Sequence, residues 1–184
     1  DNSSVHVVDW DLNTGTVLKK ITWQGAADSS AWSRGQTWGF YGYTMMYRFT
    51  KNKTYLEQAK KIARFLLSHP RLPSDKVPYW DFDAPGIPNV PRDASSAAIM
   101  ASALLELGQY TTGAEKKEYI ETAETILQSL SSPAYRAKLG ENGGFILMHS
   151  VGSLPHKSEV DAPLTYADYY FIEGLTRYKD WYLK

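Results

Sequence analysis

The chain has 184 residues, enough for one domain with a sizeable core. Its 20 basic and 20 acidic residues cancel, which argues against nucleic acid or a membrane surface as a partner, because both require a field of one sign. Cysteine is absent, so disulfides and thiolate metal sites are excluded, and four histidines without a paired spacing do not favour a zinc site.

The first elements predicted along the chain are two short strands. Residues 5–10 and 17–23 are rich in β-branched and aromatic side chains, and Asn13, Thr14 and Gly15 between them indicate a turn. We therefore expect a small N-terminal hairpin.

Helical periodicity follows for most of the remaining chain. The predicted helices cover residues 34–50, 54–68, 95–108, 115–130 and 165–179, and we interpret 132–163 as a loop. The second and fourth helices carry an apolar stripe opposite charged residues, whereas the first, third and fifth carry little charge. This alternation predicts outer and inner helices of an all-α fold.

Such helix pairs must stack on neighbouring pairs, because none buries its own apolar face. A closed α/α toroid is the favoured architecture, and an open solenoid is the alternative. Five long helices are too few to close a ring of six hairpins, so we expect an incomplete portion of the toroid. Glycines 35, 39 and 42 share one helix face, which indicates close approach of another helix or a ligand.

Functional groups are concentrated just before each inner helix. These groups occupy residues 32–38, 79–83, 91–95 and 158–168. Parallel inner helices bring their N-terminal ends together, and such ends favour anions through free N–H groups and the macrodipole. We therefore predict one shared mouth that suits a carboxylated ligand. The aromatic content of 14% fits stacking on sugars, although composition alone favours core filling.

Arg34 and Trp38 are four residues apart and share a helix face. Arginine grips a carboxylate with two parallel bonds, and an indole offers a stacking surface beside it. The alternative is that Arg34 pairs with a local aspartate and Trp38 packs in the core.

The remaining polar candidates are weaker. From the residues alone, His6 in a strand favours a structural role, and Gln24 carries little signal. His149 and His156 indicate solvated loop positions. Asp81 and Asp83 are compatible with paired acid and base chemistry, but aspartates before helices more often cap N–H groups, as we also expect for Asp93.

Five segments in order resemble glycoside hydrolase family 88, the unsaturated glucuronyl hydrolases. They are WSRGQTWGFYGYTMMYR, VPYWDFDAP, PRDASSAAI, GENGGFILMHSVG and SEVDAPLTYADYYFIEGL. The resemblance covers essentially the whole chain and implies that residues 1–184 are the C-terminal portion of a single (α/α)6-barrel domain. It also implies a bacterial protein. The sequence does not distinguish a location in the cytoplasm from one in the periplasm.

The resemblance implies release of a 4,5-unsaturated uronic acid from the non-reducing end of oligosaccharides made by polysaccharide lyases. In that family an aspartate protonates C4 of the vinyl ether and activates the water that adds at C5, and the hemiketal then rearranges to open the glycosidic bond. The reaction needs no metal or organic cofactor. The expected partners are an unsaturated uronyl oligosaccharide and the N-terminal half of the barrel.

Carried over by position, the resemblance implies substrate-binding roles for five residues: His6, Gln24, Trp32, Arg34 and Trp38. The family's key aspartates lie upstream of every residue present here, so we assign no catalytic residue to this chain and expect it to be inactive alone. Two alternatives remain open: a non-catalytic uronate-binding helical domain, and a related hydrolase of unsaturated rhamnogalacturonan fragments.

Overall fold

The structure of the chain, a computed structural model, describes residues 2–183. The elements in chain order are β1 (Val7–Trp10), β2 (Val17–Ile21), α1 (Ser33–Thr50), α2 (Lys53–Ser68), α3 (Ala94–Gly108), α4 (Gly113–Ser131), the 3-10 turn η1 (Asn142–Gly144), β3 (Ser150–Ser153), β4 (Ser158–Ala162) and α5 (Thr165–Tyr182). The five helices and the first hairpin confirm the prediction. The second hairpin, β3–β4, lies in the stretch that we expected to be a loop.

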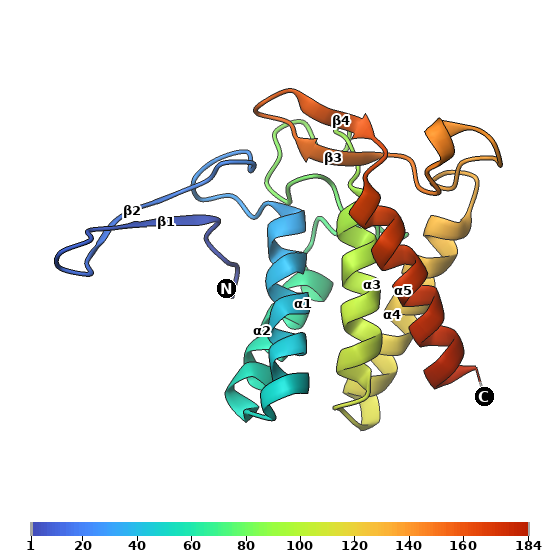
Figure 1. Cartoon of the computed structure of the whole chain (residues 1–184), viewed down its shortest axis with the longest axis horizontal. Helices are drawn as coiled ribbons and strands as arrows, with labels where there is room; N and C mark the ends of the chain where they lie inside the picture. The colour runs from blue at the N-terminus through green and yellow to red at the C-terminus, as the bar shows by residue number, and fades with distance from the viewer. Residues whose placement is uncertain (1, 184) are drawn as a thin grey trace.

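The helices form two layers. Helices α1, α3 and α5 run parallel in one row, and α2 and α4 return the chain behind them (Figure 1). Every residue of α3 is buried, because this helix is covered by α1, α4 and α5 together. The residues of α3 are apolar on nearly all sides, which suits this central position.

The outer helices bury one face only. In α2 this face consists of Ala59, Ile62, Ala63 and Leu66, which match the predicted apolar stripe. Asn52 precedes α2 and its side chain accepts a hydrogen bond from the Thr54 amide at 2.9 Å, so the helix begins with a capped N-terminus.

The two outermost helices of the inner row keep an exposed apolar face. Phe49 on α1 is 73% exposed, and Ile172 on α5 is 47% exposed. The low charge of the last predicted helix indicates a buried, inner position, which is wrong for this face. Helix α5 packs against α3 and α4 and touches α1 through the Tyr41–Tyr170 ring contact, and its remaining side meets solvent.

A buried ionic network ties the three inner helices together. Glu106 of α3 pairs with Arg177 of α5 at 3.0 Å and with Arg48 of α1 at 3.5 Å. Arg177 also pairs with Glu173 at 3.3 Å. Burial raises the pKa of Tyr41 to about 12, so its hydroxyl stays protonated and donates to Glu173. Each buried charge of this network therefore has a partner of opposite sign.

The two hairpins lie at different places. Strands β1 and β2 pair antiparallel and stand away from the helices, whereas β3 and β4 pair antiparallel above the starts of the inner helices (Figure 1). No described helix is both long and apolar enough to cross a membrane.

Candidate carbohydrate site

The segments that precede the inner helices meet at one end of the molecule, as predicted. The Ser33 amide at the start of α1 donates to Trp80 O at 3.2 Å. The Ala94 amide at the start of α3 donates to His149 O at 3.0 Å. The N-termini of α1, α3 and α5 therefore share one rim (Figure 1).

A cavity of about 380 Å³ opens on this rim beside α1. Its lining is Ser4, Val5, His6, Gln24, Ser30, Trp32, Gly35, Gln36 and Trp38. Four of the five residues predicted to bind substrate are thus brought together, although they come from three separate segments. The volume lies within the range of small-molecule sites.

The His6 ring forms one wall of the cavity. Its centroid lies 4.5 Å from that of the Trp32 ring, and Nδ1 accepts hydrogen bonds from the amides of Trp23 at 3.1 Å and Gln24 at 3.3 Å. Burial and the charge of Arg34 hold the pKa of His6 below its ordinary value of 6.5. The ring is therefore neutral at pH 7, and its remaining N–H is on Nε2.

Gln24 connects the cavity to the second hairpin. Its Nε2 donates to Gly152 O at 2.8 Å, and Gly152 lies on β3. This bond fixes the side chain through its nitrogen, so the amide oxygen is the group that can accept from a ligand.

Trp32 and Trp38 supply the aromatic surfaces. Trp32 is 6% exposed and lies over Gly35, which gives the indole room because it has no Cβ. Trp38 is half-buried, and its ring packs against Tyr166 at 5.9 Å and Tyr170 at 5.2 Å. One indole is therefore held firmly while the other keeps an accessible surface.

Arg34 lies behind the cavity and does not line it. The side chain is 3% exposed, pairs with Asp93 at 3.1 Å, and donates to the carbonyl oxygens of Val151 and Gly152. Its guanidinium lies over the Trp32 ring at 4.7 Å. The pairing with a local aspartate is the alternative that the sequence left open, and direct contact between Arg34 and a substrate stays an untested prediction.

The three aspartates bind backbone groups. Asp93 caps α3 by accepting from the Ser95 amide at 3.1 Å, as expected. Asp81 instead accepts from the Ala26 amide at 2.9 Å, and Asp83 accepts from the Ala31 amide at 3.0 Å. The expected capping role is therefore wrong for Asp81 and Asp83, which fix the segment before α1.

The two loop histidines are also engaged. His149 Nδ1 lies 2.6 Å from Asp161 Oδ1, and His156 Nδ1 lies 2.7 Å from Ser153 Oγ. Both rings remain accessible to solvent, as expected, and each also has a specific partner on or next to the β3–β4 hairpin.

The start of α1 lies beside the cavity. Trp32 occupies the N-cap position and provides no side-chain cap. No carboxylate is among the residues that line the cavity. A positively polarised helix end, two indoles, an imidazole and an amide suit binding of an anionic sugar ring. No three His, Cys, Asp or Glu side chains within residues 2–183 are grouped so as to hold a metal ion.

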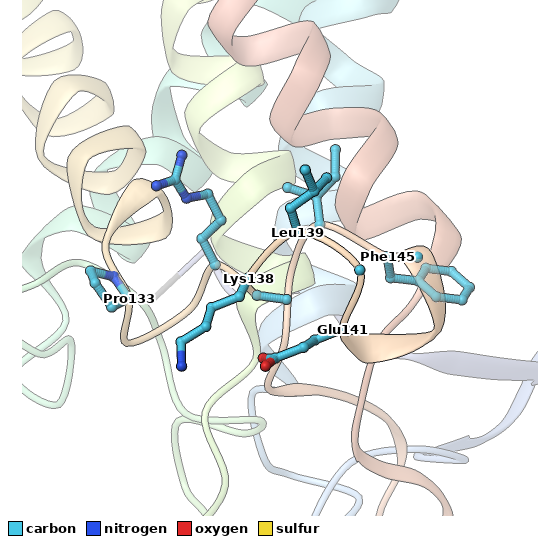
Figure 2. Close-up of a pocket in the computed structure, with 10 residues that line it drawn as sticks. Pro133, Lys138, Leu139, Glu141 and Phe145 are labelled. Atoms are coloured by element: carbon cyan, nitrogen blue, oxygen red, sulfur yellow. The ribbon is translucent and has the colours of Figure 1, made fainter.

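A larger hollow of about 590 Å³ lies in the loop between α4 and β3. Figure 2 shows Pro133 and Phe145 at its two ends, with Lys138 and Glu141 between them. Leu139 in this loop is fully exposed. None of the residues predicted to bind substrate lines this hollow.

Sequence reasoning missed several residues around the cavity. Tyr166 contacts both Arg34 and Trp38, and its position within the predicted cluster 158–168 was the available signal. Gln36 lies within the WSRGQTW segment, but the sequence does not indicate its partner. Ser4 and Ser30 gave no signal, because they lie in irregular segments, and Val5 was noted only as part of the predicted strand 5–10.

The parallel inner row, the returning outer helices and a ligand-sized cavity at the helix starts define the chain as part of an α/α toroid. The comparisons with known proteins agree. The unsaturated glucuronyl hydrolase of Formosa agariphila is 48% identical over 184 residues, which are all of this chain and 45% of that protein. No protein-family model matches the chain.

Solved structures give the same result. A crystal structure of an unsaturated glucuronyl hydrolase specific for heparin matches with a TM-score of 0.94 and 52% identity over 97% of this chain and 47% of that one. A Streptococcus agalactiae mutant enzyme matches with a TM-score of 0.83 and 36% identity over 98% and 48% of the two chains. The chain is related along its whole length to the C-terminal part of the unsaturated glucuronyl hydrolases, and it spans about half the length of the relatives it matches.

Proposed function

We propose that this chain is the sugar-binding portion of an unsaturated glucuronyl hydrolase. The observation that carries the proposal is that His6, Gln24, Trp32 and Trp38 line one cavity beside the uncapped start of α1. The ligand is a 4,5-unsaturated uronic acid at the non-reducing end of an oligosaccharide.

The chemistry of the cavity supports this ligand. The Trp32 and Trp38 rings match the flat face of an unsaturated sugar ring. His6 Nε2–H and the α1 amides are donors for the carboxylate, and Gln24 accepts from a hydroxyl. Arg34 adds positive potential from behind Trp32 while remaining paired with Asp93.

Related proteins support the substrate class. The Streptococcus agalactiae mutant enzyme was crystallised as a complex with dGlcA-GalNAc6S. We transfer the class of substrate to this chain, namely an unsaturated glucuronyl disaccharide, and leave the second sugar and its sulfation open.

The catalytic step requires a carboxylic acid that this chain does not place at the cavity. The acid that protonates C4 is therefore expected from residues outside these 184, and the region 1–184 acts as the C-terminal portion of one barrel domain. For the chain alone, the absence of a lining carboxylate favours the second candidate, a protein that binds uronates without turning them over.

Titration of the chain with an unsaturated chondroitin disaccharide, followed by tryptophan fluorescence and calorimetry, tests the binding proposal. We expect saturable binding that Trp38→Ala abolishes. Trp10→Ala is the matched control, because Trp10 is 52% exposed on β1 and does not line the cavity. Equal binding by both variants, or no binding by the wild type, contradicts the proposal.

Loss of the absorbance of the C4–C5 double bond tests turnover. We expect no loss with the chain alone and a loss when it is combined with the N-terminal half of a close relative. Turnover by the chain alone would contradict the proposal that the catalytic acid comes from residues outside these 184.

A further inference from the structure

The segment before β1 is held against α1 by one buried side chain. Gln36 is 2% exposed. Its Oε1 accepts from the Ser4 amide at 2.7 Å, and its Nε2 donates to Ser4 O at 3.0 Å. The amide thus pairs with both backbone groups of Ser4, as a neighbouring strand does.

The contact is close as well as polar. A Cβ at Gly39, one turn further along α1, would lie 3.5 Å from Ser4 Oγ. Ser4 therefore lies directly over the helix. Residues 2–6 have no regular secondary structure, so side-chain contacts such as this one determine the path of the segment.

His6 follows Ser4 by two residues and enters the cavity from this segment. Its ring lies against Trp32 with an interplanar angle of 32°, and Nδ1 receives the amides of Trp23 and Gln24. These bonds determine the tautomer of the ring. They reach the ring only if the backbone of residues 4–6 runs along α1.

We propose that Gln36 is a positioning residue, which fixes the path of residues 4–6 and thereby holds the His6 imidazole against Trp32 in the cavity wall. Its role in substrate binding rests on the proposed function, whereas the geometry it controls is a property of the unliganded chain.

Removing either hydrogen bond has a defined consequence. Ser4 is half-buried, so water satisfies its backbone groups when Gln36 is lost, and the segment moves away from α1. His6 then gains solvent and moves away from Arg34, the charge that faces it, and the pKa of His6 rises toward 6.5.

The test is a titration of the four histidines by NMR in wild type and Gln36→Met. Methionine keeps the length of the side chain without its donor and acceptor, and introduces no charge near His6. We expect the His6 titration to shift upward. His69 is the internal control, because burial lowers its pKa too, but it lies after α2, away from the cavity, and its titration should stay unchanged.

A second variant approaches the same contact from the other side. Ser4→Pro removes the amide N–H that donates to Gln36 Oε1 and leaves α1 unchanged. It should shift the titration of His6 and of no other histidine. Gln128→Met, at an exposed position of α4, should shift nothing. An unchanged His6 titration in Ser4→Pro, or in a folded Gln36→Met protein, overturns the proposal.

Binding of the unsaturated disaccharide separates this inference from the proposed function. If Gln36 positions His6 in a uronate site, Gln36→Met weakens binding along with the shift of His6. A shift of His6 in a chain whose wild type binds no uronate contradicts the proposed function and leaves the positioning role supported.

Discussion

The indole of Trp32 occupies the space that a side chain on Gly35 would need. A Cβ built on Gly35 would lie 2.5 Å from Trp32 Cε3, which is closer than such atoms approach in proteins. Because Gly35 has no Cβ, the Trp32 indole, which lines the cavity, can lie directly against α1.

Gly35→Ala should displace Trp32. The clash costs about 1–3 kcal/mol, against about 1 kcal/mol gained in helix propensity, so a net loss of stability and weaker uronate binding are expected. Gly42→Ala is the control, because its Cβ meets no atom within 4 Å, and it should stabilise the chain by about 1 kcal/mol. Urea denaturation and near-ultraviolet circular dichroism measure both. Identical effects at the two glycines contradict this explanation.

Arg34→Met should destabilise the chain by about 3–5 kcal/mol, because it leaves the buried carboxylate of Asp93 without its charge partner. Lys19→Met breaks an exposed pair with Asp9 of 3.8 Å and should change stability by less than about 1 kcal/mol. Chemical denaturation compares them. A small effect at Arg34 would show that the pair is not needed for folding.

The lowered pKa of His6 makes stability depend on pH in a defined direction. The unfolded chain binds a proton at pH 6.5 and the folded chain does so only at lower pH. Stability is therefore full above pH 6.5 and falls as the pH drops from there to the folded pKa. His69 contributes in the same direction. Denaturation between pH 5 and 8 should give a shallower slope in His6→Gln than in wild type, and an equal slope contradicts the assignment.

Glu106→Gln should disrupt the network of the inner helices. Arg177 would remain paired with Glu173 but lose its partner on α3. The free energy of unfolding is therefore expected to fall by about 3 kcal/mol. Burial and then Glu106 raise the pKa of Tyr110 to about 12, so this pKa should fall in the variant. Absorbance at alkaline pH follows the tyrosines. Glu141→Gln, in an exposed loop, should leave both values unchanged.

The sequence predicted the helices well, because their periodicity is strong and α3 has no charged face except Glu106. It did not predict the β3–β4 hairpin, whose strands are four and five residues long and include the polar run SEVDA. The amides of Ala26 and Ala31, which donate to Asp81 and Asp83, also escaped prediction, because they lie more than 50 residues away along the chain.

The site was predicted in part for similar reasons. The resemblance to family 88 implied binding roles for His6, Gln24, Trp32, Arg34 and Trp38, and the cavity contains all of them except Arg34. Arg34 lies behind the cavity because it pairs with Asp93 and donates to carbonyls of β3. These partners are distant along the chain, so no local pattern in the sequence predicts the buried position of Arg34.

The parallel inner row separates the molecule into two ends with different tolerance to change. Opposite the cavity, the helices are joined only by Lys51–Asn52 and by Gln109–Thr112, whereas all the longer connecting segments lie at the ligand end. A fluorescent label or a fused domain is therefore best attached at those two short joints, where it leaves the ligand end unobstructed.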